Sequence, residues 1–255
     1  EVPIFLSVSL TNPYMNVKTD SLRYLSLHSN QYLRYFKGHR DRVVSLCMSP
    51  VDDNFLSGSL DNTVMCWDLR TPNAQGKIDV KGRPVVAYDP KGVCFAVGCA
   101  INLIKMYDRR KFDAGPFTQF PLKSQKTIEF VDMKFSPQGH FLSVMTSDSL
   151  MLADAFTGDQ LAEFTDFENG SSLNLEASFT PDEQYLICGS ENGSIHIWHT
   201  KDKYSKVAEL QGHAGPVRCV QFNPHYSMMA SACTNVALWV PVSSTSTANT
   251  RSQYY

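Results

Sequence analysis

The chain has 255 residues, of which 43% are hydrophobic and 19% charged, a composition that supports one globular domain with a sizeable core. Its 23 Lys and Arg against 25 Asp and Glu give a net charge of −2, without the basic excess of proteins that bind nucleic acid through phosphates. The longest uncharged apolar run, residues 92–104, is too short to span a bilayer, and no basic segment precedes the apolar residues 2–10. We therefore expect no membrane partner, no direct nucleic-acid partner and no secretory signal.

The first elements in chain order are short strands within residues 4–36. Residues 21–27 align with the later segment 63–69, and residues 32–36 follow as a closing strand. Together they indicate most of one repeat unit without its first strand.

Five further units follow, each beginning at an x-Pro turn, and the turns are spaced by 40, 47, 44 and 43 residues. After each Pro come an apolar segment, a turn rich in Gly, Ser and Asn, and a second apolar segment with an aromatic residue or its substitute at the end. These end residues lie 17, 17, 16, 17 and 15 residues after the Pro and are Trp67, Tyr107, Ala153, Trp198 and Trp239. Within units, as in 57–67 and 188–198, β-branched and aromatic residues flank tight polar turns. The pattern predicts an all-β fold with about four short strands per unit.

The motifs Gly38-His39, Trp67-Asp68 and Gly212-His213 make the repeat resemble the WD40 repeat of β-propellers. The resemblance implies a hydrogen-bonded chain through His39, Ser57 (or Ser59), Asp61 and Trp67. It also places His213, Trp198 and Trp239 at equivalent positions, with Ser231 and Asn235 as partners of His213. Buried imidazole and indole N–H groups need such partners, so we interpret the His–Ser–Asp set as structural and expect no enzyme.

WD40 propellers of this kind have seven blades, and about five and a half are present here. We expect residues 1–241 to form the propeller, with the first blade and a half missing, and residues 242–255 to be a disordered tail rich in Ser and Thr. We favour truncation at the N-terminus, and the alternative is closure as a six-bladed ring.

Several stretches closely resemble the WD-repeat subunit of COMPASS histone H3 lysine-4 methyltransferase complexes, among them residues 23–28, 48–53, 55–61 and 175–181. The resemblance implies a non-enzymatic nuclear scaffold that binds subunits of the methyltransferase complex and links it to transcription. It also implies protein phosphatase 1 and mRNA 3′-end-processing factors as further partners, and no cofactor.

An alternative function rests on Trp67-Asp68-Leu69-Arg70 and Tyr107-Asp108-Arg109-Arg110, which are similar to the Trp-Asp-x-Arg signature of cullin-RING ubiquitin ligase substrate receptors. In that interpretation Asp68, Arg70, Asp108 and Arg110 are candidate partner-binding residues that meet the ligase adaptor. The simpler interpretation is that Asp68 and Arg70 pair locally at a strand end.

The seven cysteines lie in apolar stretches and form no Cys-x-x-Cys pair, so no metal site is expected. We interpret them as buried, reduced thiols of a cytosolic or nuclear protein.

Overall fold

The computed structural model describes residues 4–8, 22–99, 102–123 and 129–241. These ranges contain 22 β-strands, one short 3-10 helix (Phe112–Ala114) and no α-helix. At four strands per repeat, the 22 described strands correspond to the predicted five and a half repeats. The prediction of an all-β fold is confirmed. The predicted tail 242–255 lies outside the described residues.

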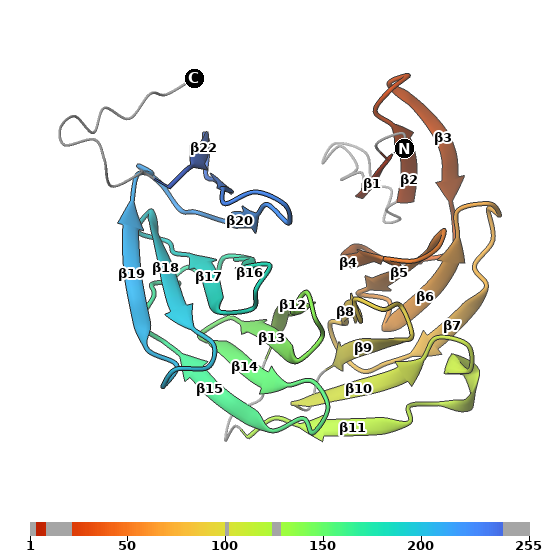
Figure 1. Ribbon diagram of the computed structural model, residues 1–255. Coiled ribbons are helices and arrows are strands. Elements are labelled where there is room, and N and C mark those ends of the chain that lie inside the picture. Colours follow the sequence, from red (N-terminus) through yellow and green to blue (C-terminus); the bar gives the residue numbers. More distant parts are fainter. Residues whose placement is uncertain (1–3, 9–21, 100–101, 124–128, 242–255) are drawn as a thin grey trace. The chain divides into compact units, whose positions relative to one another are not determined.

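The chain divides into two compact units, residues 1–135 with 156–159 and residues 136–155 with 160–255. The first unit contains three antiparallel sheets and one further strand, β12, which packs beside β8 (Figure 1). Its strands are β1 (Ile4–Val8), β2 (Leu22–Ser26) and β3 (Gln31–Phe36); β4 (Val43–Met48), β5 (Asn54–Ser59), β6 (Thr63–Asp68) and β7 (Gly76–Asp79); β8 (Val85–Tyr88), β9 (Cys94–Cys99), β10 (Leu103–Asp108) and β11 (Thr118–Pro121); and β12 (Phe130–Phe135).

The second unit continues the same arrangement, in which each strand pairs with the next along the chain. Its strands are β13 (Phe141–Thr146), β14 (Leu150–Asp154) and β15 (Gln160–Phe164); β16 (Ala177–Phe179), β17 (Tyr185–Gly189), β18 (Ser194–His199) and β19 (Lys206–Gln211); and β20 (Cys219–Phe222), β21 (Met229–Ala232) and β22 (Val236–Trp239). In the described residues the last sheet has three strands, and β22 is its edge.

Each x-Pro turn follows the first strand of a repeat, after β4, β8, β12, β16 and β20. Backbone hydrogen bonds close these turns; for example, the Ser49 N–H donates to the carbonyl of Asn54 at 2.8 Å. Proline has no N–H and fits a turn but not a central strand, so its recurrence sets where each first strand ends.

The tight turns between second and third strands contain residues with positive φ. Asn62 has φ 62° and Gly193 has φ 87°, a region that Asn and Gly tolerate. A Cβ on Gly193 would lie 2.3 Å from the carbonyl oxygen of His213, so only glycine fits there. These turns hold the third strands in register with the second.

The core lies between the faces of neighbouring sheets within each unit. In the first unit one cluster surrounds Trp67, whose ring stacks on Phe55 at a centroid distance of 5.9 Å and meets Phe36 edge-on at 5.7 Å. In the second unit a smaller cluster joins β17 and β18 to β20 and β21. The central strands are buried on both faces: all six residues of β13 and five of the six in β6 are buried.

The interpretation of the seven cysteines as buried is correct for Cys66, Cys99 and Cys188. It is wrong for Cys219, which is exposed, and holds only in part for Cys47, Cys94 and Cys233, which are partly buried. On β20 the residues alternate in direction, and the neighbouring Val220 takes the inward position. None of the seven, all of which lie in the described ranges, forms a disulfide.

Candidate functional site

The structure brings His39, Ser57, Asp61 and Trp67 together in one hydrogen-bonded chain. The indole N–H of Trp67 donates to Ser57 Oγ at 2.8 Å, and Ser57 Oγ lies 2.7 Å from His39 Nε2. Because the Asp61 carboxylate can only accept, His39 Nδ1–H donates to Asp61 Oδ2 at 3.1 Å. In the neutral ring Nε2 is then an acceptor, and the Ser57 hydroxyl donates to it. The alternative serine, Ser59, instead donates to the carbonyl of Asp41.

Burial and hydrogen bonding set the charges of this chain. Burial lowers the pKa of His39, so the imidazole is neutral at pH 7. For Asp61, partial burial raises the pKa, but hydrogen bonds from Thr63, from the Arg40 N–H and from His39 outweigh it and lower the pKa overall. The Asp61 carboxylate is therefore the charged acceptor at the end of this series of hydrogen bonds.

The glycine of each Gly-His motif makes room for a tryptophan. A Cβ on Gly38 would lie 2.9 Å from Cη2 of Trp67, and a Cβ on Gly212 would lie 2.8 Å from Cη2 of Trp239. The motif is thus a steric requirement of the indole as well as a source of the histidine.

A second chain links His213, Ser231, Cys233 and Trp239. Trp239 Nε1–H donates to Ser231 Oγ at 2.7 Å, Ser231 Oγ lies 2.6 Å from His213 Nε2, and His213 Nδ1 lies 3.1 Å from Cys233 Sγ. The expected partner Asn235 does not contact the ring in this way; its backbone N–H donates to Cys233 Sγ at 3.4 Å. The shorter turn before β22 brings a thiol to the place that the carboxylate has in the first chain.

Trp198 has a different acceptor. Its indole N–H donates to Asp166 Oδ1 at 2.9 Å, while Ser194 donates to Asn192 Oδ1 at 2.6 Å and contacts His196 Nε2 at 2.8 Å. The sequence motifs did not point to Asp166, because it lies 32 residues before Trp198 and is not part of a Gly-His motif.

Glu183 was also missed. It is fully buried with φ 57°, and its carboxylate accepts hydrogen bonds from the Gln138 N–H and from His140 Nδ1, both at 2.7 Å. Burial raises its pKa, but the donors Ser136, His140 and Gln138 outweigh burial and lower it overall. The carboxylate ties the turn after β16 to the turn before β13.

The four candidate partner-binding residues form two equivalent turns in the first unit. The backbone N–H of Arg70 donates to Asp68 Oδ1, and that of Arg110 to Asp108 Oδ1, both at 2.8 Å. The Arg70 guanidinium also grips Asp68, with Nη2 to Oδ2 at 2.6 Å, and these hydrogen bonds lower the pKa of Asp68 to about 2. The side chain of Arg70 is nevertheless 72% exposed.

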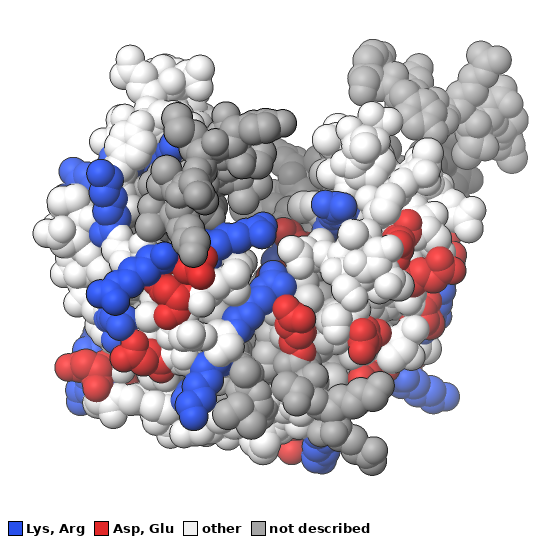
Figure 2. All heavy atoms as spheres, turned by 180° about the vertical axis from the view of Figure 1, so that it is seen from behind, with Lys and Arg blue, Asp and Glu red and all other residues white. Residues whose placement is uncertain are grey.

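In Figure 2 Lys and Arg side chains lie among Asp and Glu side chains on the face that is drawn, in agreement with the net charge of −2. Within the described ranges no three His, Cys, Asp or Glu side chains group as metal ligands, and no helix is long and apolar enough to cross a membrane.

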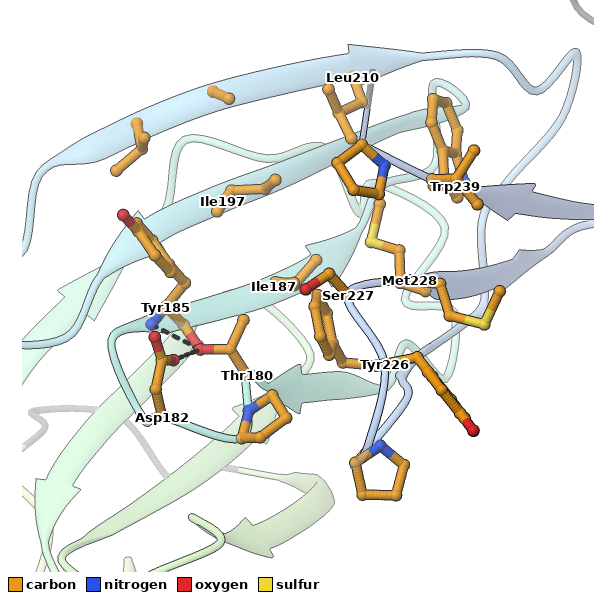
Figure 3. Close-up of a pocket in the computed structure, with 18 of the residues that line it drawn as sticks. Thr180, Asp182, Tyr185, Ile187, Ile197, Leu210, Tyr226, Ser227, Met228 and Trp239 are labelled. Carbon is orange, nitrogen blue, oxygen red and sulfur yellow. Dashed lines mark hydrogen bonds between the residues drawn. The ribbon is translucent and has the colours of Figure 1, made fainter. Parts of the chain in front are cut away.

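An apolar groove of about 710 Å³ lies in the second unit, between β17–β19 and the last sheet (Figure 3). Ile187, Ile197 and Leu210 line one side, and Met228 and Trp239 line the other. Beside it, β22 exposes the apolar side chains Val236 (68%) and Leu238 (70%). Sequence reasoning named Trp239 only for its network and did not foresee this groove.

Comparison with known proteins identifies the fold family. The model of the WD domain, G-beta repeat, matches residues 30–68, 171–199 and 204–238. WD repeat-containing protein 82 of Drosophila melanogaster is 52% identical over 226 residues, which cover 88% of this chain and 71% of that protein. COMPASS component SWD2 of Saccharomyces cerevisiae is 37% identical over 237 residues, covering 88% and 72%. Set1 complex component swd2 of Schizosaccharomyces pombe is 36% identical over 188 residues, covering 70% and 53%.

The matched ranges include His39, Ser57 and Trp67 of the first hydrogen-bonded chain, and His213 and Ser231 of the second, whose Trp239 lies one residue beyond the last range. No catalytic family is indicated by these matches. The sheets are therefore blades of a WD40 β-propeller, and the chain belongs to the WD-repeat family that includes WD repeat-containing protein 82 and SWD2.

Proposed function

We propose that this chain is a non-enzymatic scaffold subunit of a nuclear, COMPASS-type histone H3 lysine-4 methyltransferase complex. One observation carries the proposal: the similarity to SWD2, named a COMPASS component, extends over 88% of this chain and 72% of that protein. In this role the chain binds the catalytic methyltransferase subunit and links it to transcription. Protein phosphatase 1 and 3′-end-processing factors are further partners under the same proposal.

The chemistry of the His–Ser–Asp set supports a scaffold over a hydrolase. Ser57 is fully buried, its oxygen accepts a hydrogen bond from Trp67, and its O–H donates a hydrogen bond to His39. A nucleophilic serine must be reached by its substrate, and the buried Ser57 oxygen, which already accepts from Trp67, is not accessible to one.

The alternative, a substrate receptor of a cullin-RING ligase, depends on exposed arginines at the adaptor. The hydrogen bonds from Arg70 Nε and Nη2 to Asp68 support the local pair at this strand end, although the Arg70 side chain is 72% exposed. The backbone N–H of Arg110 donates to Asp108, and the residue is exposed. Arg110 is therefore the arginine that supports the ligase-receptor alternative.

Affinity purification of the tagged chain from nuclei tests the two functions directly. We expect methyltransferase-complex subunits to co-purify, and we expect the double variant Arg70→Glu, Arg110→Glu to retain them while losing any ligase adaptor. The opposite result would be a ligase adaptor that co-purifies with the wild-type chain and is lost in the double variant, with no methyltransferase subunits in either sample. That result would favour the ligase-receptor function over the scaffold function.

A further inference from the structure

Two segments of the second unit contain the same four residues in the same order. Residues 168–171, in the loop between β15 and β16, and residues 191–194, at the turn from β17 to β18, both read Glu-Asn-Gly-Ser. They hold the only two Asn-Gly pairs of the sequence. The side-chain amide of an Asn before Gly is open to attack by the next backbone nitrogen, because glycine has no side chain that blocks the approach. Since the four residues are identical, a difference in reactivity between the two segments comes from the fold.

The fold holds the side chain of Asn169 at both of its polar atoms. Its Nδ2 donates to the carbonyl of Ser147 at 3.0 Å and to that of Leu173 at 3.1 Å. Its Oδ1 accepts from the Leu173 N–H at 2.7 Å. The side chain must give up these three hydrogen bonds before its carbonyl carbon can turn toward the backbone nitrogen of Gly170.

The backbone nitrogens that would attack also differ in their surroundings. The carboxylate of Glu191 accepts from the Ser171 N–H at 2.9 Å and also interacts with the backbone N–H of Gly170. The attacking nitrogen must lose its proton, and a negative charge beside it opposes that loss. In the second segment the Gly193 N–H instead donates to the neutral carbonyl of Ser190 at 3.2 Å.

Asn192 is held at its oxygen only. Its Oδ1 accepts from the Ser194 N–H at 2.9 Å and from the Ser194 hydroxyl at 2.6 Å. Its Nδ2 donates to no group within the part of the chain that the structure describes. Asn192 is also exposed, whereas Asn169 is partly buried. The amide nitrogen that would leave therefore faces water at Asn192 and is bound twice at Asn169.

We propose that Asn192 is a covalent modification site, which deamidates in the folded chain while the fold protects Asn169. The backbone nitrogen of Gly193 attacks Cγ of Asn192, the new N–C bond closes a succinimide ring, and the Cγ–Nδ2 bond breaks. The electron pair of that bond leaves with ammonia, which takes up the proton that the Gly193 nitrogen loses. Water then opens the ring at either carbonyl and gives aspartate or isoaspartate.

The aspartate product has a counterpart in the first unit. Oδ1 of Asp61 accepts from the Thr63 N–H at 3.1 Å and from the Thr63 hydroxyl at 2.6 Å, the same two contacts that Asn192 makes two residues along. A carboxylate therefore fits this turn. Isoaspartate instead lengthens the main chain of a turn in which Gly193 lies against the carbonyl of His213, so it displaces that contact.

The experiment follows both sites in the wild-type full chain, incubated at mildly alkaline pH and body temperature. Cleavage after glutamate separates them into residues 169–176 and 192–209, and mass spectrometry measures the mass gain as an amide becomes an acid. We expect Asn192 to react about tenfold faster than Asn169, since the one additional hydrogen bond at Asn169 corresponds to about 1.4 kcal/mol. In urea the two rates should become equal. Equal rates in the folded chain, or a faster reaction at Asn169, would overturn the proposal.

Two variants test the site and its product. Asn192→Gln keeps an amide but requires a larger ring, so the mass gain in residues 192–209 should disappear. If it persists at the wild-type rate, the reaction lies at another residue and the proposal is wrong. Asn192→Asp should unfold at the wild-type urea midpoint, since Asp61 has the same contacts, and a clearly lower midpoint would contradict a carboxylate that fits the turn.

Discussion

Replacement of Asp61 by Ala tests the buried hydrogen-bonded chain. Asp61 accepts from His39 Nδ1 at 3.1 Å, from the Arg40 N–H at 2.8 Å and from Thr63 Oγ1 at 2.6 Å, and the His39 side chain is 1% exposed. An unsatisfied buried donor costs about 1–3 kcal/mol. After the substitution, Thr63 Oγ1 at 3.2 Å is the remaining acceptor near Nδ1, which reduces the cost, while the lost turn contacts add to it. We expect a loss of about 2 kcal/mol in the free energy of unfolding.

Urea unfolding followed by far-UV circular dichroism measures this loss. With a slope of about 2 kcal/mol per molar urea, the midpoint should fall by about 1 M. Asp79→Ala is the matched control, because the Asp79 side chain is 82% exposed and pairs with Lys77 on the surface. A loss for Asp61→Ala no larger than that for Asp79→Ala would refute the argument that the carboxylate holds a buried imidazole.

Three further predictions concern other contacts. Gly38→Ala should cost about 1–3 kcal/mol in thermal or urea unfolding, because its methyl would meet an indole at 2.9 Å, whereas Gly215→Ala, with open space around the new methyl, should be close to wild type. Glu183 has a lowered pKa in the folded chain, so the stability that it adds is present above its ordinary pKa of 4.5 and is lost as the pH falls below it; Glu183→Gln should flatten the dependence of the unfolding midpoint on pH in that acidic range. In Arg70→Ala, a carboxyl NMR titration should show the pKa of Asp68 rising from about 2 toward its ordinary value of 3.8, and an unchanged pKa would exclude the local pair.

The repeat could be predicted from the sequence because particular residue types are required at its turns. Proline cannot donate a hydrogen bond within a β-sheet, and the turn at Asn62 needs a residue that tolerates positive φ. Both kinds of turn can therefore be recognised in the amino-acid sequence. The tryptophans at the ends of β6, β18 and β22 then follow from constant offsets after each Pro. Period and turn residues together determine the strands without any knowledge of packing.

The acceptors could not be predicted in the same way. Asp166 reaches Trp198 from 32 residues away, and Cys233 replaces Asn235 because a turn two residues shorter changes which side chain meets the imidazole. Glu183 lies in a turn with a polar sequence but is fully buried, since its donors come from a segment more than forty residues earlier in the chain. These contacts depend on the distance between strands of different repeats, which periodicity does not contain.

The three tryptophans also give the molecule built-in optical reporters. Trp67 and Trp198 are each 1% exposed and belong to different compact units, whereas Trp239 is half-buried beside the groove. Their indoles hydrogen-bond to a serine, a carboxylate and a second serine, respectively, so the three emit from distinct surroundings. Chains that keep a single tryptophan, with Phe at the other two positions, would report the melting of each region separately through the red shift of fluorescence on exposure to water.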